Sequence, residues 1–265
     1  MEMMSKYQSQ YLRKVRRNRQ IVTLTRIVIL IAFVGLWEWT AKEGVIDSFV
    51  FSSPSKIVIC FVDMVKDKTI YGHIGVTLYE TVASFLLVTV IGILCAIMLW
   101  IWPKVSEICD PYLVVLNSLP KSALAPLLIV WLGANMTTII VSGVSVAVFG
   151  SILNLHTSFN GTSQDKIKLI YTLGGKRYHA LTKVVLPASI PSIISNMKVN
   201  IGLCLVGVII GEFIGARKGL GYLIIYSSQV FKLDWLLMSI VILCIIAMLL
   251  YNLIAAIEKW CLKRY

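Results

Sequence analysis

The sequence predicts an all-α membrane protein with six transmembrane helices. Of its 265 residues, 58% are hydrophobic and 14% are charged, whereas roughly a quarter of the residues of a soluble domain are charged. Several uncharged runs reach the roughly 20 residues that a helix needs to cross a hydrocarbon layer. Lys and Arg gather at the ends of these runs, so membrane topology explains the net charge of +12 better than nucleic-acid binding does.

Residues 1–20 form a basic segment before the first predicted span, residues 21–40. That apolar stretch is too long for a signal peptide and lacks a small-residue cleavage site, so we expect a retained first helix. In residues 49–72, the mixed apolar and charged side chains after Pro54 predict a short amphipathic helix at the outer interface, and a plain spacer fits equally well. The second span, residues 78–102, ends in an aromatic belt and a proline.

The third and fourth spans come from an uncharged run, residues 122–155, which is too long for one helix. The Gly-Ala-Asn sequence at 133–135 divides this run and leaves a fourth span at 136–155. Pro120 and Pro126 predict that the third span is kinked or broken. Lipid tolerates such a break only where other helices satisfy the freed carbonyl groups.

The fifth and sixth spans are residues 193–211 and 235–257. The fifth contains Lys198, whose long side chain can either snorkel to the interface or contact an anion. No repeat of fixed period occurs, so we expect one membrane domain, residues 21–257, between the N-terminal segment and a tail, residues 258–265.

The distribution of Lys and Arg between the spans predicts that both termini are cytoplasmic. With the N-terminus inside, the cytoplasmic segments hold Lys6, Arg13, Lys14, Arg16, Arg17, Arg19, Lys104, Lys166, Lys168, Lys176, Arg177, Lys183, Lys259, Lys263 and Arg264. The outer segments hold Lys42, Lys56, Lys66, Lys68, Arg217, Lys218 and Lys232. The excess on the inner side places the polar loop at about 160–190 in the cytoplasm.

This loop carries the strongest functional signal. Apolar residues recur at near-helical spacing over residues 164–173, which predicts a short amphipathic helix with the apolar positions Ile167, Leu169, Ile170 and Leu173. Gly174 and Gly175 suit a left-handed helix end. A second short helix is predicted from Lys176 to Val185, stopping at Leu186 because Pro187 disfavours a helical conformation in the residue before it.

An exposed helix, glycine turn and second helix with apolar side chains favour docking into a groove on another protein. Packing of the same loop on the chain's own helices is the alternative. The spacing of Gly174, Val184, Leu186 and Pro187 resembles the cytoplasmic loop of permease subunits from binding-protein-dependent ABC importers. The pattern of that loop reads Glu-Ala-Ala, three residues, Gly, nine residues, an aliphatic residue, any residue, then Leu-Pro.

The resemblance extends along nearly the whole chain. The third span, SLPKSALAPLLIVWLG, is similar to the Pro-rich segment of the sulfonate, taurine and nitrate branch of these permeases. Further landmarks of that branch are Trp37-Glu38, Ser53-Pro54-Ser55, Asp110-Pro111, Glu212 and Gly219-Leu220-Gly221. One departure concerns the loop, where Lys168, Leu169 and Ile170 replace the Glu-Ala-Ala residues. The bulkier side chains should alter how closely an ATPase can approach.

The resemblance implies a type I ABC importer permease fold with cytoplasmic coupling helices, in a bacterial cytoplasmic membrane. The implied partners are a second copy of the permease, two soluble ATP-binding subunits, an extracytoplasmic solute-binding protein and membrane lipid, with no nucleic acid. The implied function is ATP-driven import of a small polar or anionic solute by alternating access. The ATPase-coupling residues would be Lys168, Tyr171, Leu173, Gly174, Gly175, Leu186 and Pro187.

Nothing in the chain indicates an active site. No G-x-x-x-x-G-K-[ST] phosphate loop occurs, because Gly174-Gly175-Lys176 lacks the first glycine at its spacing and the following hydroxyl. The three histidines are scattered, and no paired carboxylates or Ser-His-Asp arrangement is indicated. We therefore expect no enzyme activity and no cofactor bound by this chain, with ATP and Mg held by the partner ATPase subunits.

Polar residues inside the spans are candidates for a translocation path or gate: Glu212, Asn154, Asn200 and Ser142. An intramembrane acid is usually paired or functional, so Glu212 is a candidate for a gate or an intersubunit hydrogen bond. An interfacial acid that faces water or Arg217 is the alternative. The Asn and Ser residues could line a polar path or serve helix packing.

The alternative function is an ion-coupled secondary transporter. Such folds often show inverted repeats, broken helices and carboxylates at mid-depth in the membrane. The broken third span fits, but neither a matching half nor a central acid is evident. A membrane scaffold is a third reading, and it would need neither the Pro-rich span nor the loop.

Overall fold

The computed structural model describes residues 6–262, which contain helices and no strand. The predicted tail residues Lys263 and Arg264 lie outside the described residues. The chain divides into two compact units, Met1–Asp63 and Met64–Tyr265, and each is described by itself.

The first unit contains helix α1 (Lys6–Lys42) and most of helix α2 (Pro54–Lys66). Helix α1 continues without a break from the basic segment into the first predicted span, so the helix is longer than the span. Helix α2 begins at a proline, whose missing N–H costs nothing in the first turn. The Ile57 side chain is buried while the Val58 and Ile59 side chains are exposed, which confirms the predicted amphipathic helix.

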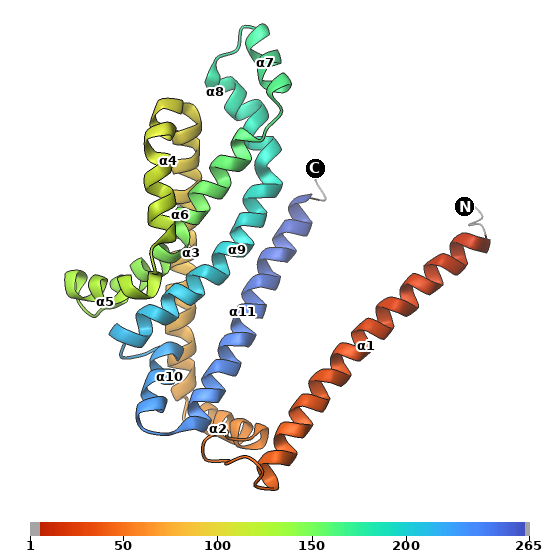
Figure 1. The fold of residues 1–265 in the computed structure, drawn as a ribbon, viewed down its shortest axis with the longest axis vertical. Coiled ribbons are helices and arrows are strands. Elements are labelled where there is room, and N and C mark those ends of the chain that lie inside the picture. Colours follow the sequence, from red (N-terminus) through yellow and green to blue (C-terminus); the bar gives the residue numbers. More distant parts are fainter. Residues whose placement is uncertain (1–5, 263–265) are drawn as a thin grey trace. The chain divides into compact units, whose positions relative to one another are not determined.

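The second unit is built around three long helices, α3 (Thr69–Ile101), α6 (Met136–Asn160) and α9 (Leu186–Gly215), each of which contacts the other two (Figure 1). Helix α10 (Leu220–Gln229) packs on α9, and helix α11 (Leu233–Leu262) packs on both. Including α1, five helices of the described chain are long and apolar enough to cross a membrane.

A further span is a bent pair, helix α4 (Pro103–Ser118) followed by helix α5 (Lys121–Leu132), with an angle of 95° between them. The break falls at Leu119 and Pro120, as the prolines predict. The extent of the predicted third span is wrong, because α5 alone is too short to cross a membrane. Helix α4 carries charged side chains, so a search for uncharged runs overlooks it. Six spans result when the pair counts as one.

Glycine and serine let the central helices approach closely. A Cβ on Gly207 of α9 would lie 2.8 Å from the Cα of Gly143 on α6. Ser84 of α3 donates a hydrogen bond to Ile140 O of α6 at 3.0 Å. Membrane helices associate through small residues of this kind, because lipid supplies no hydrophobic drive for helix pairing. The three helices therefore form the packed centre of the second unit.

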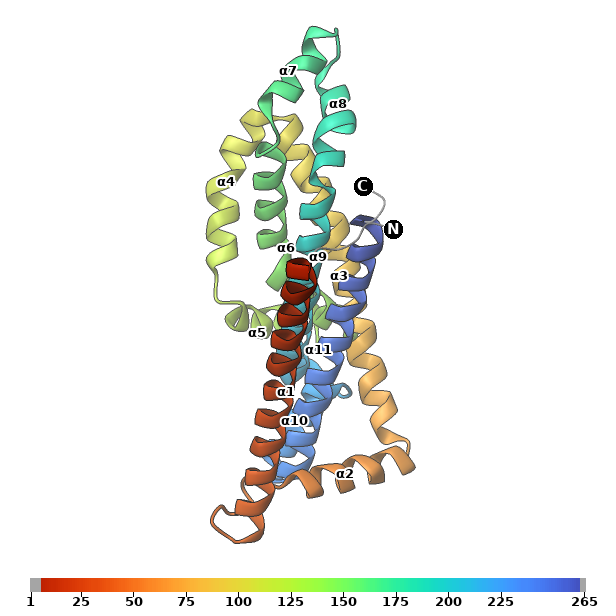
Figure 2. The same cartoon turned by 90° about the vertical axis from the view of Figure 1, so that its right-hand side faces the viewer.

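The predicted cytoplasmic loop lies at one end of this unit, and α10 lies at the opposite end (Figure 2). The loop contains α7 (Gln164–Thr172), α8 (Arg177–Ala180) and a π-helical turn, η1 (Leu181–Val185). We call residues 164–187 the coupling segment. The helix that contains the fifth span is longer than predicted, because α8, η1 and α9 form one continuous helix of 39 residues, Arg177–Gly215.

The predicted helix stop at Leu186 is therefore wrong. Leu186 keeps a helical φ of −60° and ψ of −50°. Pro187 lies in the first turn of α9, after the π-helical turn. Proline has no N–H to donate to the preceding turn, and its ring needs space there. The wider turn before it thus lets the helix pass the proline.

Candidate functional site

Helix α7 ends in a turn that depends on two glycines. Gly174 has a φ of +79°, a left-handed conformation that glycine adopts without steric cost. The N–H of Gly174 donates to Tyr171 O at 3.0 Å and that of Gly175 to Ile170 O at 2.8 Å, the Schellman pattern of a helix end. A Cβ on Gly175 would lie 2.7 Å from Ile170 O. Glycine is thus needed at 174 for its positive φ, and at 175 because a side chain would clash with the Ile170 carbonyl group. Both observations confirm the predicted helix end.

The coupling segment divides its apolar side chains between two faces. Ile167 is buried and Ile170 packs on the same cluster, which includes Trp100, Leu155 and Phe159. In contrast, Leu169 is 58% exposed, Leu173 is 75% exposed and Tyr178 is 66% exposed. Burying large apolar side chains against a partner is favourable by about 1.5–3 kcal/mol each. We call these three residues, with Tyr171, the exposed face of the coupling segment.

The predicted coupling residues fall into two groups. Lys168, Tyr171, Leu173 and Gly174 are exposed, and Gly175, Leu186 and Pro187 are partly buried. Leu186 packs on the cluster below the segment rather than on its exposed face. The first group is therefore accessible to a partner, and the last two residues lie at the start of α9.

Arg177 joins the coupling segment to α3. Its Nη2 donates a hydrogen bond of 2.6 Å to the carbonyl oxygen of Trp100, and its guanidinium lies 5.0 Å from the centre of the Trp100 ring. The last carbonyl groups of a helix lack intrahelical partners, so a charged donor is favourable there. The sequence does not predict this pair, because its only signals are an arginine in the loop and a tryptophan at a helix end.

At the opposite end of the unit, Glu212 of α9 is 1% exposed. Its Oε1 accepts a hydrogen bond of 2.6 Å from Thr77 of α3, and its Oε2 accepts one of 2.5 Å from the Gly221 N–H of α10. A Cβ on Gly219, where φ is +120°, would collide with the Glu212 carboxyl group. The carboxyl group therefore ties three helices together. The alternative of an interfacial acid facing water is wrong.

A second buried acid, Glu80 of α3, was missed because it lies near the start of an otherwise apolar run. Glu80 is 1% exposed, and its Oε2 has no hydrogen-bond partner among the described residues. Glu80 lines a cavity of ≈ 270 Å³ together with Asn135 and Arg217. The two acids thus give this end of the unit a polar interior.

The other candidate path residues lie on α6 and α9. Ser142 is buried and donates to Gly207 O at 2.9 Å. Asn200 is buried and donates to Ser151 Oγ at 2.9 Å. Asn154 alone of the three is exposed. Ser142 and Asn200 thus hold two helices together, and their role in a path stays a prediction.

Asn154 belongs to a polar pocket on the surface of α6 and α9. The pocket has a volume of ≈ 400 Å³ and is lined by Asn154, Thr157, Ser158, Ser192, Ser195, Asn196 and Val199. Polar side chains inside membrane spans normally face other helices or a water-filled space rather than lipid. This surface is therefore a candidate wall of a translocation path.

Lys198 is paired with an acidic side chain, so neither of the two predicted roles, snorkelling to the interface or contact with an anion, describes it. Its Nζ lies 2.7 Å from Glu258 Oε2 of α11, and both side chains are mostly buried. Sequence alone did not pair them, because Glu258 follows the predicted sixth span. The ion pair links α9 to α11.

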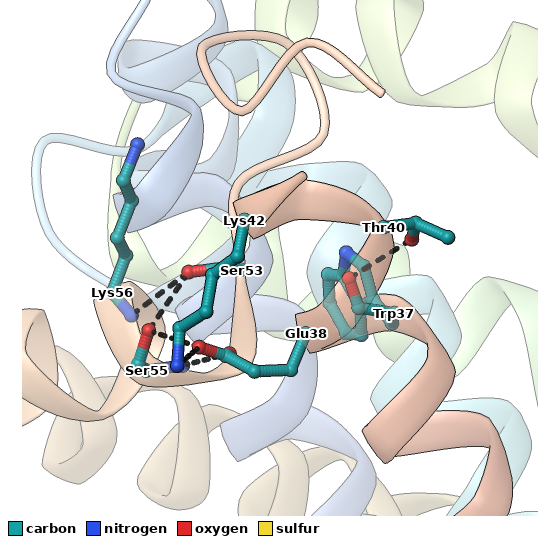
Figure 3. Close-up of polar contacts among 7 residues, drawn as sticks. All are labelled: Trp37, Glu38, Thr40, Lys42, Ser53, Ser55 and Lys56. Atoms are coloured by element: carbon teal, nitrogen blue, oxygen red, sulfur yellow. Dashed lines mark hydrogen bonds and ion pairs between the residues drawn. The ribbon is translucent and has the colours of Figure 1, made fainter. Parts of the chain in front are cut away.

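In the first unit, two sequence landmarks meet at the start of α2 (Figure 3). Glu38 of α1 accepts hydrogen bonds from the Ser55 N–H at 3.0 Å and from Ser55 Oγ at 2.9 Å. Lys42 pairs with the same carboxylate at 3.0 Å. A carboxylate is favourable at a helix N-terminus, where backbone N–H groups lack partners. Glu38 therefore fixes where α2 begins.

Across residues 6–262, no group of three or more His, Cys, Asp or Glu side chains is arranged to hold a metal ion. Two other features are candidates for contact with other molecules, the exposed face of the coupling segment and the polar residues on α6 and α9.

These features are those of a transport permease, and comparison with known proteins gives its family. The family model for the binding-protein-dependent transport system inner membrane component matches residues 88–258. The chain belongs to this family.

Three relatives illustrate the branch. The chain is 23% identical to the aliphatic sulfonates transport permease protein SsuC of Bacillus subtilis, over 97% of this chain and 94% of that protein. It is 24% identical to the formylaminopyrimidine transport permease protein ThiX of Halalkalibacterium halodurans, over 77% and 81%. It is 25% identical to the taurine transport system permease protein TauC of Escherichia coli, over 73% and 70%.

Solved structures share the fold at lower identity. A chain of a bacterial ABC transporter involved in alginate import gives a TM-score of 0.64 at 13% identity, covering 94% of this chain and 98% of that chain. A chain of the MetNI methionine ABC transporter in an inward-facing conformation gives a TM-score of 0.64 at 17% identity, covering 72% and 94%. The fold is therefore that of a type I ABC importer permease.

Proposed function

We propose that this permease imports a small polar or anionic solute by alternating access, driven by two ATP-binding subunits that dock on the coupling segments of two copies of the chain. An extracytoplasmic binding protein delivers the solute. The relatives are named as permeases for sulfonates, taurine and formylaminopyrimidine, and these solutes support a small polar substrate. Both termini lie in the cytoplasm, as the Lys and Arg distribution predicts.

One observation carries the proposal above the others. The coupling segment exposes Leu169, Leu173 and Tyr178 outside the apolar spans, and Arg177 holds the same segment against α3. Large apolar side chains on a polar loop suit a protein groove. Because the segment continues into α9 without a break, a partner that moves the segment also moves a membrane-spanning helix. Ion-coupled transport would require neither feature.

Purification with nucleotide labelling tests the proposal. The chain, isolated in mild detergent from membranes that contain its natural partners, should retain a soluble subunit that a photoreactive ATP analogue labels. Leu173→Asp with Tyr178→Asp should lose that subunit, because two charges would enter an apolar groove. Lys183→Ala, which changes an exposed residue of the same segment, is the control.

Uptake gives the second arm of the test. Solute accumulation should stop when the labelled subunit is made catalytically inactive. Accumulation that continues unchanged, or a purified chain that retains no nucleotide-binding subunit, contradicts ATP-driven import and favours the ion-coupled alternative.

A further inference from the structure

The polar pocket of α6 and α9 has properties that helix packing alone does not require. Four of its residues, Thr157, Ser158, Ser192 and Ser195, carry hydroxyl groups. Within the described chain, these hydroxyl groups make no hydrogen bond to another residue. In membrane helices, Ser and Thr commonly bond to carbonyl groups of their own helix. The four groups here remain free to bond to something in the pocket.

Asn196 gives an independent indication of a ligand. Its side chain is 8% exposed, and its Nδ2 donates a hydrogen bond of 2.8 Å to Ser151 Oγ. Its Oδ1 is buried and has no partner among the described residues. An unpaired buried acceptor costs about 1–3 kcal/mol. Because Asn196 also lines the pocket, a rotation of its amide would let a bound molecule donate a hydrogen bond to Oδ1 and remove this cost.

The charge of the pocket restricts the kind of molecule. No charged side chain is among its lining residues. Lys198, two residues beyond Asn196, is held by Glu258 at 2.7 Å. A net charge bound here would lack a counter-charge inside the membrane, which is unfavourable. Hydroxyl groups and amides can instead serve both the donors and the acceptors of an uncharged molecule.

The volume also fits a small molecule. The pocket is an open depression of ≈ 400 Å³, a size within the range of about 300–1,000 Å³ that small-molecule sites have. It lies on the turns of α6 and α9 next to the coupling segment, on the side where the orientation proposed above places the cytoplasm. A solute on its way into the cell would pass this level of the membrane.

We propose that this pocket is a solute-binding station for a small molecule without net charge, neutral or zwitterionic, that carries at least one N–H or O–H donor for Asn196 Oδ1. The inference rests on the proposed import function and narrows its solute class. Several weak hydrogen bonds without an ion pair would give weak, reversible binding. Transport needs such binding, because a solute must leave the site as readily as it enters.

Ligand-observed NMR with the full chain in lipid nanodiscs tests the proposal. Three probes are compared: taurine, a zwitterion; ethanesulfonate, which has the same skeleton without the ammonium group; and cytosine, which is neutral. Taurine or cytosine should bind in the millimolar range, more tightly than ethanesulfonate. Asn196→Leu should weaken that binding about five- to tenfold, the effect of one lost hydrogen bond.

Two further variants keep the test decisive if Asn196→Leu fails to fold. Ser195→Ala and Asn154→Ala change exposed pocket residues, and each should weaken probe binding. Ser189→Ala is the matched control, since Ser189 is a buried serine of α9 with an unpaired hydroxyl group that does not line the pocket. It should leave probe binding unchanged.

Three results would overturn the inference. Ethanesulfonate binds at least as tightly as both other probes; no probe binds; or the pocket variants change the oligomeric state in native mass spectrometry but not probe binding, which makes the pocket a contact between copies. Retention of the ATP-binding subunit is measured on the same samples. A chain that keeps this subunit but fails the probe test overturns the inference and leaves the import function standing.

Discussion

Arg177 and Trp100 are 77 residues apart in sequence, yet the arginine donates a hydrogen bond of 2.6 Å to the tryptophan's carbonyl oxygen and lies over its ring. Trp100 is 5% exposed, so the arginine packs on a fixed surface. A guanidinium group combines a planar face with several donors, and lysine has no equivalent. The pair therefore restrains the coupling segment against α3.

Arg177→Lys should consequently loosen this restraint while keeping the charge. Loss of a hydrogen bond to a charged group typically costs about 1.5–3 kcal/mol, and the thermal unfolding midpoint in detergent should fall. If the proposed import function holds, solute uptake per ATP hydrolysed should fall as well. Lys183→Ala provides the basic-residue control. An unchanged midpoint and unchanged uptake would show that the pair is dispensable.

The two glycines after α7 should respond differently to substitution. Gly174 needs its left-handed angle but has open space around it, so Gly174→Asn should cost less than Gly174→Val, because Asn visits this conformation and a β-branched residue does not. Gly175→Ala should be more disruptive than Gly174→Asn, since its Cβ meets a backbone oxygen. Limited proteolysis of the segment measures the order. Equal cleavage of all three variants would contradict the assigned roles.

Gly219→Ala should destabilise the second unit. The added methyl group collides with the Glu212 carboxyl group, and the φ of +120° strains any side chain, together costing at least about 2 kcal/mol. Gly202→Ala is the matched control, because it lies in α9 with nothing within 4 Å of the added atom. Its unfolding midpoint should be unchanged or raised, as alanine favours helix by about 1 kcal/mol over glycine. Equal midpoints for both variants would argue against the Glu212 contact.

The ion pair between Lys198 and Glu258 should show up in a double-mutant cycle. Each partner is replaced by a neutral residue, Lys198→Met and Glu258→Gln, singly and together. Because removal of one partner leaves the other charge mostly buried, the single variants should lose more stability than half of the double variant's loss. Thermal unfolding of the four proteins gives the coupling energy. A coupling energy of zero would mean that the helices α9 and α11 do not depend on this pair.

Glu38→Ala should shift the start of α2. It removes both hydrogen bonds from Ser55, and loss of a helix cap costs about 0.5–2 kcal/mol. Amide hydrogen exchange at residues 55–57 should accelerate, while Lys42→Ala, which leaves both bonds in place, serves as control. Slow exchange retained in Glu38→Ala would show that α2 begins there without this cap.

Features that depend on local chemistry could be predicted from the sequence. The positive φ at Gly174, the break at Pro120 and the amphipathic α2 each follow from a few neighbouring residues. The continuation through Pro187 could not be predicted, because a π-helical turn absorbs the proline and no sequence signal marks such a turn.

Contacts between residues far apart in the sequence could not be predicted either. Thr77 and Glu212 are 135 residues apart, and no pattern in either helix shows that they meet. The same holds for Asn196 and Ser151, 45 residues apart. Candidate path residues were chosen for being polar inside apolar runs, a criterion that also selects residues that join helices. Only the packing of α6 and α9 shows that Asn154 is open while Ser142 and Asn200 are enclosed.

The 39-residue helix from Arg177 to Gly215 is about 58 Å long at 1.5 Å per residue, and it is fastened to α3 at both extremities. One fastening is Arg177 to Trp100, and the other is Glu212 to Thr77. Because these contacts join α3 and α9 near both of their ends, we expect the two helices to behave as one rigid body. If the proposed import function holds, we expect α3 and α9 to move together and the other helices to move relative to them.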